Sequence, residues 1–319
     1  MATAPVEEPT NEPVPETEDW FASMDDDTQK DWANVLLWGK EGSYKTTAVA
    51  RLANLPGPGK ALVINAEGGL KKLALQRQGV DTSKLVFWPD PRKKEVLSRA
   101  SLDKVFRRVK ADLMRDPDSW KGIAWDSVTE IYQTVLNHAT DARQLRLQNQ
   151  GKDFDPDFVD RADYGTMSKM VRDLLRKFRD LPCHFFVTAL ERRDIDPDTN
   201  KPVYGPAISP ALGTDLLGYV DVTIYMKSAD EDGPGRGLTK DSVRFRVKDR
   251  FGVLPRVVAN ATADRIVGYI TGDITEDEDP FQDDLPNKAK TAQDRPDVPL
   301  KTVDDEAGEN DGTADSSDD

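Results

Sequence analysis

The sequence is short of the residues that build disulfide frameworks and metal clusters. Its 319 residues include one cysteine, Cys183, and two histidines, His138 and His184. A single cysteine excludes a disulfide within the chain, and so few thiol and imidazole side chains argue against a Cys/His metal site. We therefore expect a protein of a reducing compartment, the cytoplasm.

Long apolar runs are missing as well. No stretch approaches the ~18 consecutive apolar residues that cross a bilayer. The first ten residues, MATAPVEEPT, contain neither the basic nor the apolar region of a signal peptide. These absences predict a soluble protein without a membrane partner.

Charged residues are abundant and unevenly distributed. The formal net charge is −14, from 44 basic and 58 acidic side chains. Residues 1–31 contain ten acidic side chains and one lysine, and residues 271–319 contain seventeen acidic and four basic side chains, which leaves 39 basic and 31 acidic side chains on residues 32–270. The acidic ends are rich in Pro, Thr and Ser, and such a composition predicts disorder because it buries too little surface to offset the entropy of ordering. We therefore predict one domain at 32–270 between disordered acidic tails at 1–31 and 271–319.

Two roles are open for the acidic tails. An acidic tail is either a solubilising brush or an intramolecular competitor that occupies a basic nucleic-acid groove until a polyanion displaces it. The first role requires only exposed charge, whereas the second requires a basic groove on the folded domain.

Short apolar runs alternate with helical segments along the middle of the chain. The runs NVLLW, KALVINAE, KLVFW, KGIAWD and CHFFVTAL have the length and the branched or aromatic residues of buried strands. The longest helices are predicted at 94–116, 127–147 and 164–181. This alternation predicts an α/β fold with a mostly parallel central sheet and helices on both faces. Two later strands, at 219–227 and 241–249, are expected to extend the sheet with antiparallel pairing near its edge.

The segment GKEGSYKTT, residues 39–47, follows the first predicted strand and opens the first helix. Its G-x-x-x-x-x-K-T pattern is typical of a phosphate-binding loop, in which backbone N–H groups and a helix N-terminus surround the β-phosphate. Lys45 is placed to reach the β- and γ-phosphates, and Thr46 is placed to ligate Mg²⁺. ATP and Mg²⁺ are the cofactors that this loop predicts. The predicted nucleotide-binding residues are Gly39, Lys40, Glu41, Gly42, Ser43, Tyr44, Lys45, Thr46 and Thr47.

Tyr44 departs from the common form of this loop, which has glycine before the lysine. A non-glycine residue held in left-handed backbone space costs about 1–2 kcal/mol, which a well-packed domain tolerates. We expect the aromatic ring to lie over the nucleotide or against a neighbouring subunit. The alternative to phosphate binding is an ordinary glycine-containing turn with an exposed lysine.

Two carboxylates stand at the ends of predicted strands. Asp126 ends the run GIAW, and Glu67 ends the run LVIN in the setting NAEGG. In a parallel sheet the ligand crevice lies at the carboxyl ends of the strands, and ATP hydrolysis needs one carboxylate for the metal and another for the attacking water. We therefore predict Asp126 as a metal-holding Walker B residue and Glu67 as the catalytic base. The alternative for each is a helix cap or a solvated loop carboxylate.

The residues at these positions resemble RecA. The stretch GKALVINAEGGLKKLALQRQGVDTSKLVFWPDP is similar to the RecA segment that carries the catalytic glutamate, GKEGSYKTT is similar to the RecA phosphate loop, and AWDSVTEI is similar to its Walker B strand. With LPCHFFVTALERRD, the pattern resembles compact RecA-like ATPases of phages that anneal or recombine single strands, and it covers about residues 33–255. The resemblance implies a RecA-like ATPase acting on single-stranded DNA in phage recombination or replication, in the cytoplasm of the host cell. It also implies self-association into a filament or ring and a possible single-strand binding protein as partner.

The resemblance implies further roles near the C-terminal part of the domain. Lys248 and Arg250, in the run VKDR, are similar to the basic residues with which RecA reaches the γ-phosphate of a neighbouring subunit. A solvated strand end is the alternative. The strand CHFFVTAL lacks the glutamine with which RecA senses the γ-phosphate, and Thr188 or Glu191 is expected to substitute for it.

RecA-like proteins bind single strands through two loops, which by position are residues 143–163 and 191–215 here. Cationic and aromatic side chains on such loops suit tracking of the backbone and stacking on bases, although solvation alone also explains charged loops. The first segment offers Arg143, Arg146, Lys152 and Arg161. The predicted DNA-binding residues of the second are Arg192, Arg193, Lys201 and Tyr204.

Two other functions fit the phosphate loop. Lys40, Gly42 and the Lys45–Thr46 pair also resemble the deviant loop of ParA-type proteins, nucleotide-switched dimers in which the early lysine crosses to the partner. The chain is alternatively a scaffold that binds nucleotide without hydrolysing it. The run DSV after Trp125 and the AEGG strand end favour the RecA-like ATPase.

Overall fold

The computed structural model describes residues 31–276 except 154, 156–157, 197, 229–234 and 241–243. Nearly all of both predicted tails lies outside these residues, so the tails and the domain limits at 32–270 stay predictions. No helix of the described part is long and apolar enough to cross a membrane.

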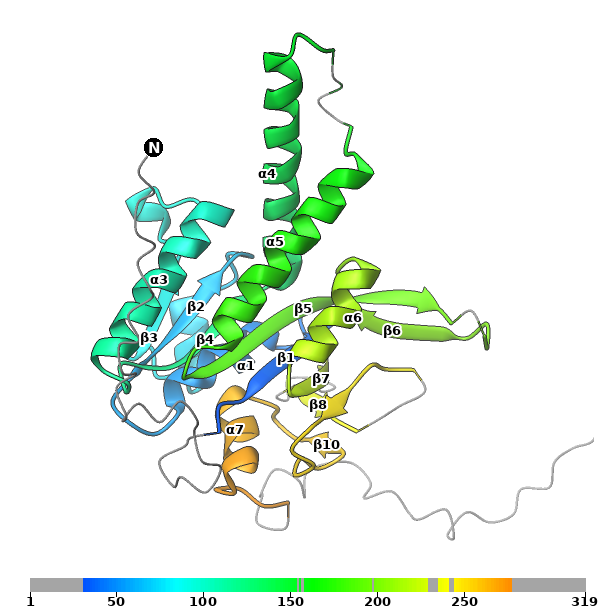
Figure 1. Cartoon of the computed structure of the whole chain (residues 1–319). Coiled ribbons are helices and arrows are strands. Elements are labelled where there is room, and N and C mark those ends of the chain that lie inside the picture. The colour runs from blue at the N-terminus through cyan, green and yellow to red at the C-terminus, as the bar shows by residue number, and fades with distance from the viewer. Residues whose placement is uncertain are drawn as a thin grey trace, which may run out of the picture.

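A single sheet forms the centre of the molecule, and its middle is parallel (Figure 1). Along the sheet the order is β10-β8-β7-β1-β5-β4-β2-β3, with β6 paired to β5 and β9 paired to β7. All pairs from β3 across to β7 are parallel, whereas β7–β8, β8–β10, β5–β6 and β7–β9 are antiparallel. This confirms a mostly parallel sheet with antiparallel pairing toward one edge. The strands are β1 (Asn34–Gly39), β2 (Lys60–Asn65), β3 (Leu85–Trp88), β4 (Trp120–Asp126), β5 (His184–Ile195), β6 (Pro202–Pro206), β7 (Val222–Lys227), β8 (Arg236–Leu238), β9 (Lys248–Asp249) and β10 (Val257–Val258).

Helices cover both faces of the sheet because alternate strand residues are apolar toward each side. Trp125 of β4 and Phe185 of β5 belong to one apolar core, and Ala124 and Phe186, their chain neighbours, belong to the other. The first core packs under α3 (Arg99–Arg115), α4 (Val128–Asn149), α5 (Arg161–Arg179) and α6 (Pro210–Tyr219); the second packs under α1 (Lys45–Ala50), η1 (Arg51–Asn54) and α7 (Ala263–Thr271). The short elements α2 (Lys72–Arg77) and η2 (Pro91–Lys93) flank β3 in the chain.

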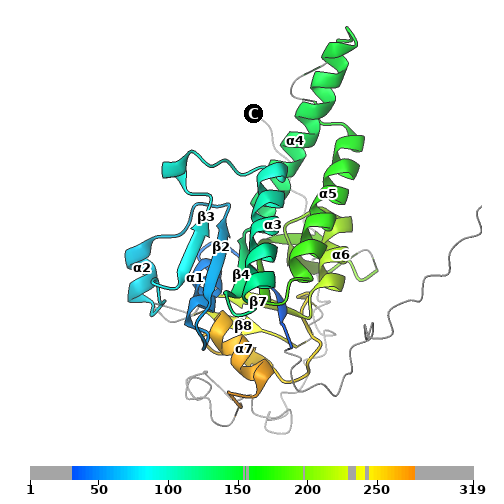
Figure 2. The ribbon, with the colours of Figure 1, turned by 60° about the vertical axis from the view of Figure 1, so that its left-hand side comes forward.

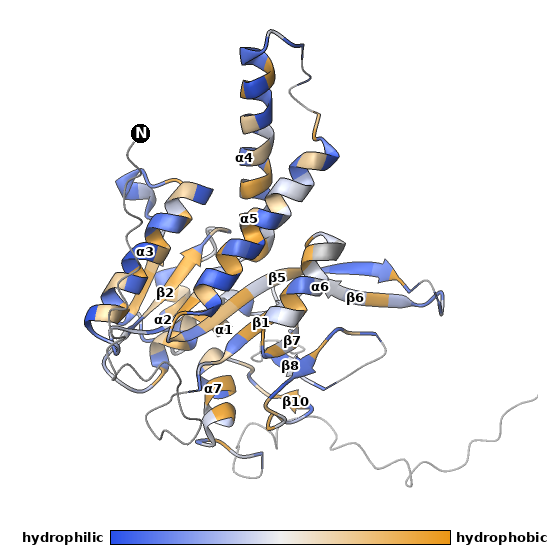
Figure 3. Ribbon diagram, viewed as in Figure 1, coloured by the Kyte–Doolittle hydropathy of each residue, from blue (hydrophilic) through white to orange (hydrophobic). Residues whose placement is uncertain are grey.

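Local capping residues set where the long helices begin. Ser98 and Ser101 form a capping box at the start of α3, which is why the helix begins at residue 99 and not at 94 as the hydrophobic pattern predicts. Asp160 and Asp163 form a second capping box, so α5 begins three residues earlier than predicted. The two helices α4 and α5 extend together beyond the sheet (Figures 1 and 2). Figure 3 shows hydrophobic residues on the parts of both helices next to the sheet, where Ile131 of α4 and Leu174 of α5 are buried.

Alanine substitution at two glycines tests the backbone conformation that the structure assigns to each. Gly272 ends α7 with φ 81°, a conformation that L-residues rarely adopt, whereas Gly165 lies within α5, where an added Cβ meets no atom within 4 Å. We expect Gly272→Ala to lower the free energy of unfolding by about 1 kcal/mol and Gly165→Ala to raise it by about 0.5–1 kcal/mol. Urea denaturation of the two variants measures both changes. If both substitutions change the free energy of unfolding in the same direction and by the same amount, the backbone conformations assigned to Gly272 and Gly165 are wrong.

Candidate nucleotide-binding site

The phosphate loop lies at the carboxyl end of β1, in the middle of the sheet. Trp38, the residue before the loop, is paired with Ala189 of β5 and Tyr225 of β7. At Gly39 an added Cβ would lie 2.3 Å from the carbonyl oxygen of Met226, so only glycine allows the strands to approach so closely. The loop then turns at Gly42, with φ 71°, and enters α1.

Tyr44 adopts the left-handed backbone conformation that its place before the lysine predicts. Its φ and ψ are 64° and 14°, directly before α1 begins. The residue also lines a 330 Å³ cavity together with Thr47, Arg51 and Gln78. The hydroxyl of Thr47 donates a hydrogen bond of 2.5 Å to the side-chain oxygen of Gln78. Tyr44 and Thr47 thus border a space next to the phosphate loop.

The ammonium group of Lys45 is held inside the loop. The side chain is 7% exposed, and Nζ donates hydrogen bonds to the carbonyl oxygens of Gly39 (2.9 Å) and Lys40 (2.6 Å) and to Oγ of Ser43 (3.2 Å). Burial lowers the pKa of Lys45, and the carboxylates of Glu67, Asp126, Glu41 and Glu191, in that order, oppose the shift. Four acidic side chains therefore act electrostatically on the Lys45 ammonium group.

Asp126 has the surroundings expected of a metal-holding carboxylate. It is 1% exposed, and Oδ1 accepts a hydrogen bond of 2.6 Å from the hydroxyl of Thr188 on β5. Its other oxygen is buried and has no hydrogen-bond partner among the described residues. Burial raises the pKa of Asp126, while the Thr188 and Thr46 hydroxyls lower it. Because an unpartnered buried carboxylate oxygen close to a threonine hydroxyl suits a hard cation, these residues fit Mg²⁺.

No cluster of three or more His, Cys, Asp or Glu side chains that could bind a metal occurs among the described residues. This does not conflict with a magnesium site, because Mg²⁺ is usually held by one or two carboxylates together with phosphate oxygens and water. The donors offered by the protein are Asp126 and Thr46.

Glu67 follows β2 and is tied to the end of β4. The backbone N–H groups of Ala66 and Glu67 donate to the carbonyl oxygen of Asp126, at 2.7 and 3.1 Å. The Glu67 side chain is exposed, and it is the carboxylate that most strongly opposes the lowering of the pKa of Lys45. The site therefore combines one buried and one exposed carboxylate near the same ammonium group. This is the division of roles expected for a metal ligand and a water-directed base.

An aromatic stack that the sequence did not predict lies next to the site. The ring of Tyr225 lies 4.8 Å from that of Trp38 and 4.1 Å from that of Phe245, and Phe245 is stacked on Tyr204. Burial and a hydrogen bond with Glu191 raise the pKa of Tyr225 to about 12. The only signal in the sequence was an aromatic residue near the end of the strand YVDVTIYMK, which by itself predicts core packing.

The two residues proposed to sense the γ-phosphate have different surroundings. Thr188 is fully buried and bonded to Asp126, whereas Glu191 is partly exposed, with Oε2 unpartnered among the described residues. Glu191 also belongs to the set of carboxylates that act on Lys45. Thr188 thus holds Asp126 in position, whereas Glu191 interacts with Tyr225 at this end of β5.

Lys248 and Arg250 lie at the opposite end of the sheet from the phosphate loop. β9 pairs with the first residues of β7, which are level with Val35 near the start of β1. Lys248 Nζ donates to the carbonyl oxygens of Leu217 (2.9 Å) and Val220 (2.7 Å) at the end of α6. Arg250 forms an ion pair of 2.7 Å with Asp221. Neither residue can serve the phosphate loop of its own chain, so a role in trans stays a prediction.

The second predicted DNA loop is a β-hairpin in its first part. β5 continues beyond the sheet and pairs with β6. Arg192 is engaged within the protein, since it pairs with Asp194 at 2.5 Å and donates to the carbonyl oxygen of Ile208. Arg193 and Lys201 are exposed. Of the four residues, these two are available for a nucleic acid, while Arg192 and the stacked Tyr204 build the hairpin.

The first predicted DNA loop, residues 143–163, is helical at both ends. Arg143 and Arg146 belong to α4, and Arg161 opens α5. Arg143 pairs with the buried carboxylate of Asp163 at 2.8 Å and so joins the two helices. The segment therefore forms the end of a hairpin of two helices and not a loop of twenty residues.

Comparisons with known proteins show to which family the chain belongs. Residues 32–251 match an AAA domain. The chain belongs to this AAA domain family. No curated protein matches the sequence. Among solved structures, the crystal structure of the RadB recombinase is similar over 65% of this chain and 79% of that chain, with 15% identity and a TM-score of 0.37.

The AAA domain family and the architecture together confirm the predicted fold class, a P-loop α/β domain with a mostly parallel central sheet. The family also supports a nucleotide-using ATPase in general terms. The functions of individual residues, DNA binding, self-association and a phage origin stay predictions.

The buried carboxylate predicts a pH-dependent stability. Because the pKa of Asp126 is raised in the folded state, the wild-type protein loses stability as the pH rises from the ordinary pKa near 4 toward the raised value. We expect Asp126→Asn to be more stable than wild type at pH 7, by about 1–2 kcal/mol without nucleotide. Thermal denaturation between pH 4 and 8 measures the difference, with the exposed Asp141→Asn as a neutral control. A variant less stable than wild type at pH 7 contradicts the assignment.

Proposed function

We propose that this AAA domain protein hydrolyses Mg²⁺-bound ATP and that it does so as a RecA-like, single-strand DNA-dependent ATPase. The placement of Lys45, Asp126 and Glu67 at the carboxyl ends of β1, β4 and β2, with the backbone of Glu67 bonded to that of Asp126, carries this proposal. A structural turn has no need for two carboxylates next to a buried lysine, because desolvating such charges is unfavourable. A site for a phosphate and its metal does need them.

Each residue has a definite task in this proposal. Thr46 and the unpartnered oxygen of Asp126 would hold Mg²⁺, which would neutralise charge on the phosphates. Lys45 exchanges its bonds to the Gly39 and Lys40 carbonyl oxygens for bonds to phosphate oxygens. The exposed carboxylate of Glu67 orients the attacking water and accepts its proton. Thr188 keeps Asp126 in position through its 2.6 Å hydrogen bond.

The nucleoside has a suitable space next to this site. The 330 Å³ cavity begins at Tyr44 and Thr47, at the start of the helix whose N-terminus faces the phosphates. Its other walls include Arg51, whose guanidinium is held by Asp264, and Gln78. We place the sugar and base here, with the Tyr44 ring as the aromatic wall.

The proposed link to DNA follows β5. This strand carries Thr188 and Glu191 at the phosphate site and then continues into the hairpin with the exposed Arg193 and Lys201. A strand that extends from the site to the hairpin gives a direct mechanical connection between nucleotide and single-stranded DNA. The position of Lys248 and Arg250 at the opposite edge suits head-to-tail assembly, in which one subunit's amino-terminal edge meets the next subunit's phosphate loop.

Replacement of Glu67 by Gln is the main test. We expect E67Q to retain ATP binding in calorimetry and to lose at least about 100-fold in steady-state hydrolysis, because an amide cannot accept the proton of the attacking water. Glu276→Gln, at an exposed glutamate outside the site, is the matched control and should keep normal turnover. Hydrolysis by E67Q at the wild-type rate removes Glu67 from the mechanism. If the wild-type protein binds ATP but does not hydrolyse it, the protein is a scaffold and not an ATPase.

The DNA proposal has its own test. We expect the double variant Arg193→Ala/Lys201→Ala to bind single-stranded DNA about ten-fold more weakly and to reduce the slope of log affinity against log salt by roughly 1–2. Fluorescence anisotropy at several salt concentrations measures both quantities. Lys60→Ala/Lys169→Ala, two exposed lysines outside the hairpin, is the charge-matched control. Equal losses in both double variants, or none in either, argue against the hairpin as the DNA site.

A further inference from the structure

Glu191 lies where β5 leaves the parallel sheet and enters the β5–β6 hairpin (Figure 1). The residue before it, Leu190, is the last of β5 to pair with β1, opposite Gly39 of the phosphate loop. Glu191 itself is the first to pair with β6, opposite Pro206. One oxygen of its carboxylate, Oε2, is buried and has no hydrogen-bond partner among the described residues. The phosphate loop and the hairpin thus meet at one acidic side chain.

Tyr225 of β7 reaches this side chain across β1. Ala189, Trp38 and Tyr225 are neighbours on β5, β1 and β7, and neighbours in a parallel sheet direct their side chains to the same face. Glu191 returns to that face because it comes two residues after Ala189 on the same strand. The Tyr225 hydroxyl forms a hydrogen bond with the Glu191 carboxylate. The register of three strands therefore brings the two side chains together.

The Tyr225 hydroxyl remains a hydrogen-bond donor over the whole physiological range of pH. Its pKa is raised to about 12, first by burial and then by the neighbouring carboxylate, so the phenol stays neutral. A hydrogen bond from a neutral hydroxyl to a carboxylate is stronger than one between two neutral groups. Tyr225 can therefore hold Glu191 in place whether or not a nucleotide is bound.

The ring of Tyr225 is also part of a continuous aromatic stack. Its centroid lies 4.8 Å from that of Trp38, the residue before the phosphate loop, and 4.1 Å from that of Phe245. Phe245 lies 5.4 Å from Tyr204 of β6, and the N–H of Tyr204 donates a 2.7 Å hydrogen bond to the carbonyl oxygen of Arg244. Tyr225 thus contacts the hairpin through its hydroxyl at β5 and through the stacked rings at β6.

A bound polyphosphate changes the electrostatic surroundings of Glu191. Glu191 is one of the four carboxylates that act on the Lys45 ammonium group. Once Lys45 bonds to phosphate oxygens, the negative charge of the phosphates opposes that of Glu191. The carboxylate is then favoured on the Tyr225 side, where a donor compensates its charge. Because Glu191 belongs to the first residue pair of the hairpin, any such shift changes the start of the hairpin.

We propose that Tyr225 is a positioning residue that couples occupation of the phosphate loop to the β5–β6 hairpin by holding Glu191 through its hydroxyl. This inference rests on the proposed function, because it takes the phosphate loop as the nucleotide site and the hairpin as the DNA site. Tyr225 touches neither the metal nor the attacking water in this role. Its loss is therefore expected to weaken the response of the hairpin to nucleotide and to leave nucleotide binding almost unchanged.

Hydrogen–deuterium exchange of the full-length protein, with and without Mg²⁺ and a non-hydrolysable ATP analogue, tests the coupling. In the wild type we expect the analogue to change the exchange rate of hairpin N–H groups about two-fold or more. Tyr225→Phe keeps the ring and removes the hydroxyl, so it should reduce that change by about half or more, with the analogue affinity in calorimetry within about three-fold of wild type. Tyr219→Phe, which removes a hydroxyl bonded to Arg176, is the matched control and should respond like the wild type.

A double-mutant cycle separates coupling from a purely structural role. Glu191→Gln and the double variant Tyr225→Phe/Glu191→Gln should each give the same reduction as Tyr225→Phe alone, because one change removes the donor and the other removes the charge of a single link. Additive reductions overturn the proposal.

Two further results decide between this inference and the proposed function. A Tyr225→Phe variant that responds like the wild type, or a wild-type hairpin that does not respond to bound analogue, overturns the coupling and leaves the nucleotide site intact. If calorimetry detects no binding of the analogue to the wild type, the proposed function fails and the coupling fails with it.

Discussion

The arrangement of charge around Lys45 is the constraint on which the site depends. An ammonium group and a carboxylate are both almost fully withdrawn from water here, and each is unfavourable alone. Lys45 is compensated by two backbone carbonyl oxygens and a hydroxyl, whereas Asp126 accepts the Thr188 hydroxyl at Oδ1 and has no hydrogen-bond partner at Oδ2 among the described residues. The carboxylate is therefore the less satisfied partner. This imbalance favours the binding of a cation and a polyphosphate, which together would satisfy the Asp126 carboxylate and the Lys45 ammonium group.

The parallel sheet makes this concentration of charge possible. Strand ends that point the same way bring Glu67, Asp126 and Thr188 to one edge, although 121 residues separate the first from the last. Backbone hydrogen bonds from Ala66 and Glu67 to the carbonyl oxygen of Asp126 then hold two of these strand ends together. The acidic groups are thus positioned by the sheet itself and not by mobile loops. Close packing of Gly39 against β7 fixes the phosphate loop at the same edge of the sheet.

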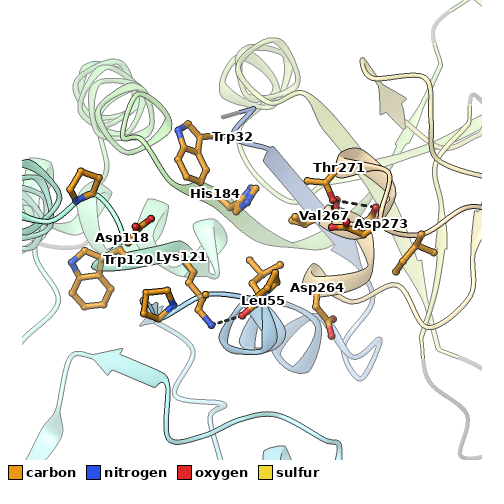
Figure 4. Close-up of a pocket in the computed structure, with 17 residues that line it drawn as sticks. Trp32, Leu55, Asp118, Trp120, Lys121, His184, Asp264, Val267, Thr271 and Asp273 are labelled. Carbon is orange, nitrogen blue, oxygen red and sulfur yellow. Dashed lines mark hydrogen bonds between the residues drawn. The ribbon is translucent and has the colours of Figure 1, made fainter. Parts of the chain in front are cut away.

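The two edges of the sheet have different chemical characters. The carboxyl edge holds the buried lysine, the carboxylates and the aromatic stack around Tyr225. The amino edge holds a 530 Å³ cavity lined by Trp32, Lys121 and His184 (Figure 4). It also holds Lys248 and Arg250, whose charges are already engaged by carbonyl oxygens and by Asp221. The proposed nucleotide chemistry therefore lies at one edge of the sheet and the proposed assembly contacts at the other.

The sequence alone determined the alternation of strands and helices, the phosphate loop and the two strand-end carboxylates, because each depends on local pattern and on neighbours close in the chain. It also predicted that Tyr44 departs from the usual backbone preference, and the left-handed φ of 64° agrees. Helix starts were less accurate because side-chain caps such as Ser98 and Asp160 override the hydrophobic pattern. Only the tertiary structure decided that Arg143 and Arg192 are engaged in ion pairs, that Tyr204 stacks on Phe245, and that Tyr225 meets Glu191. Except for the pair of Arg192 with Asp194, these contacts join residues far apart in the chain. The sequence alone does not show whether a charged or aromatic side chain has a partner in the fold.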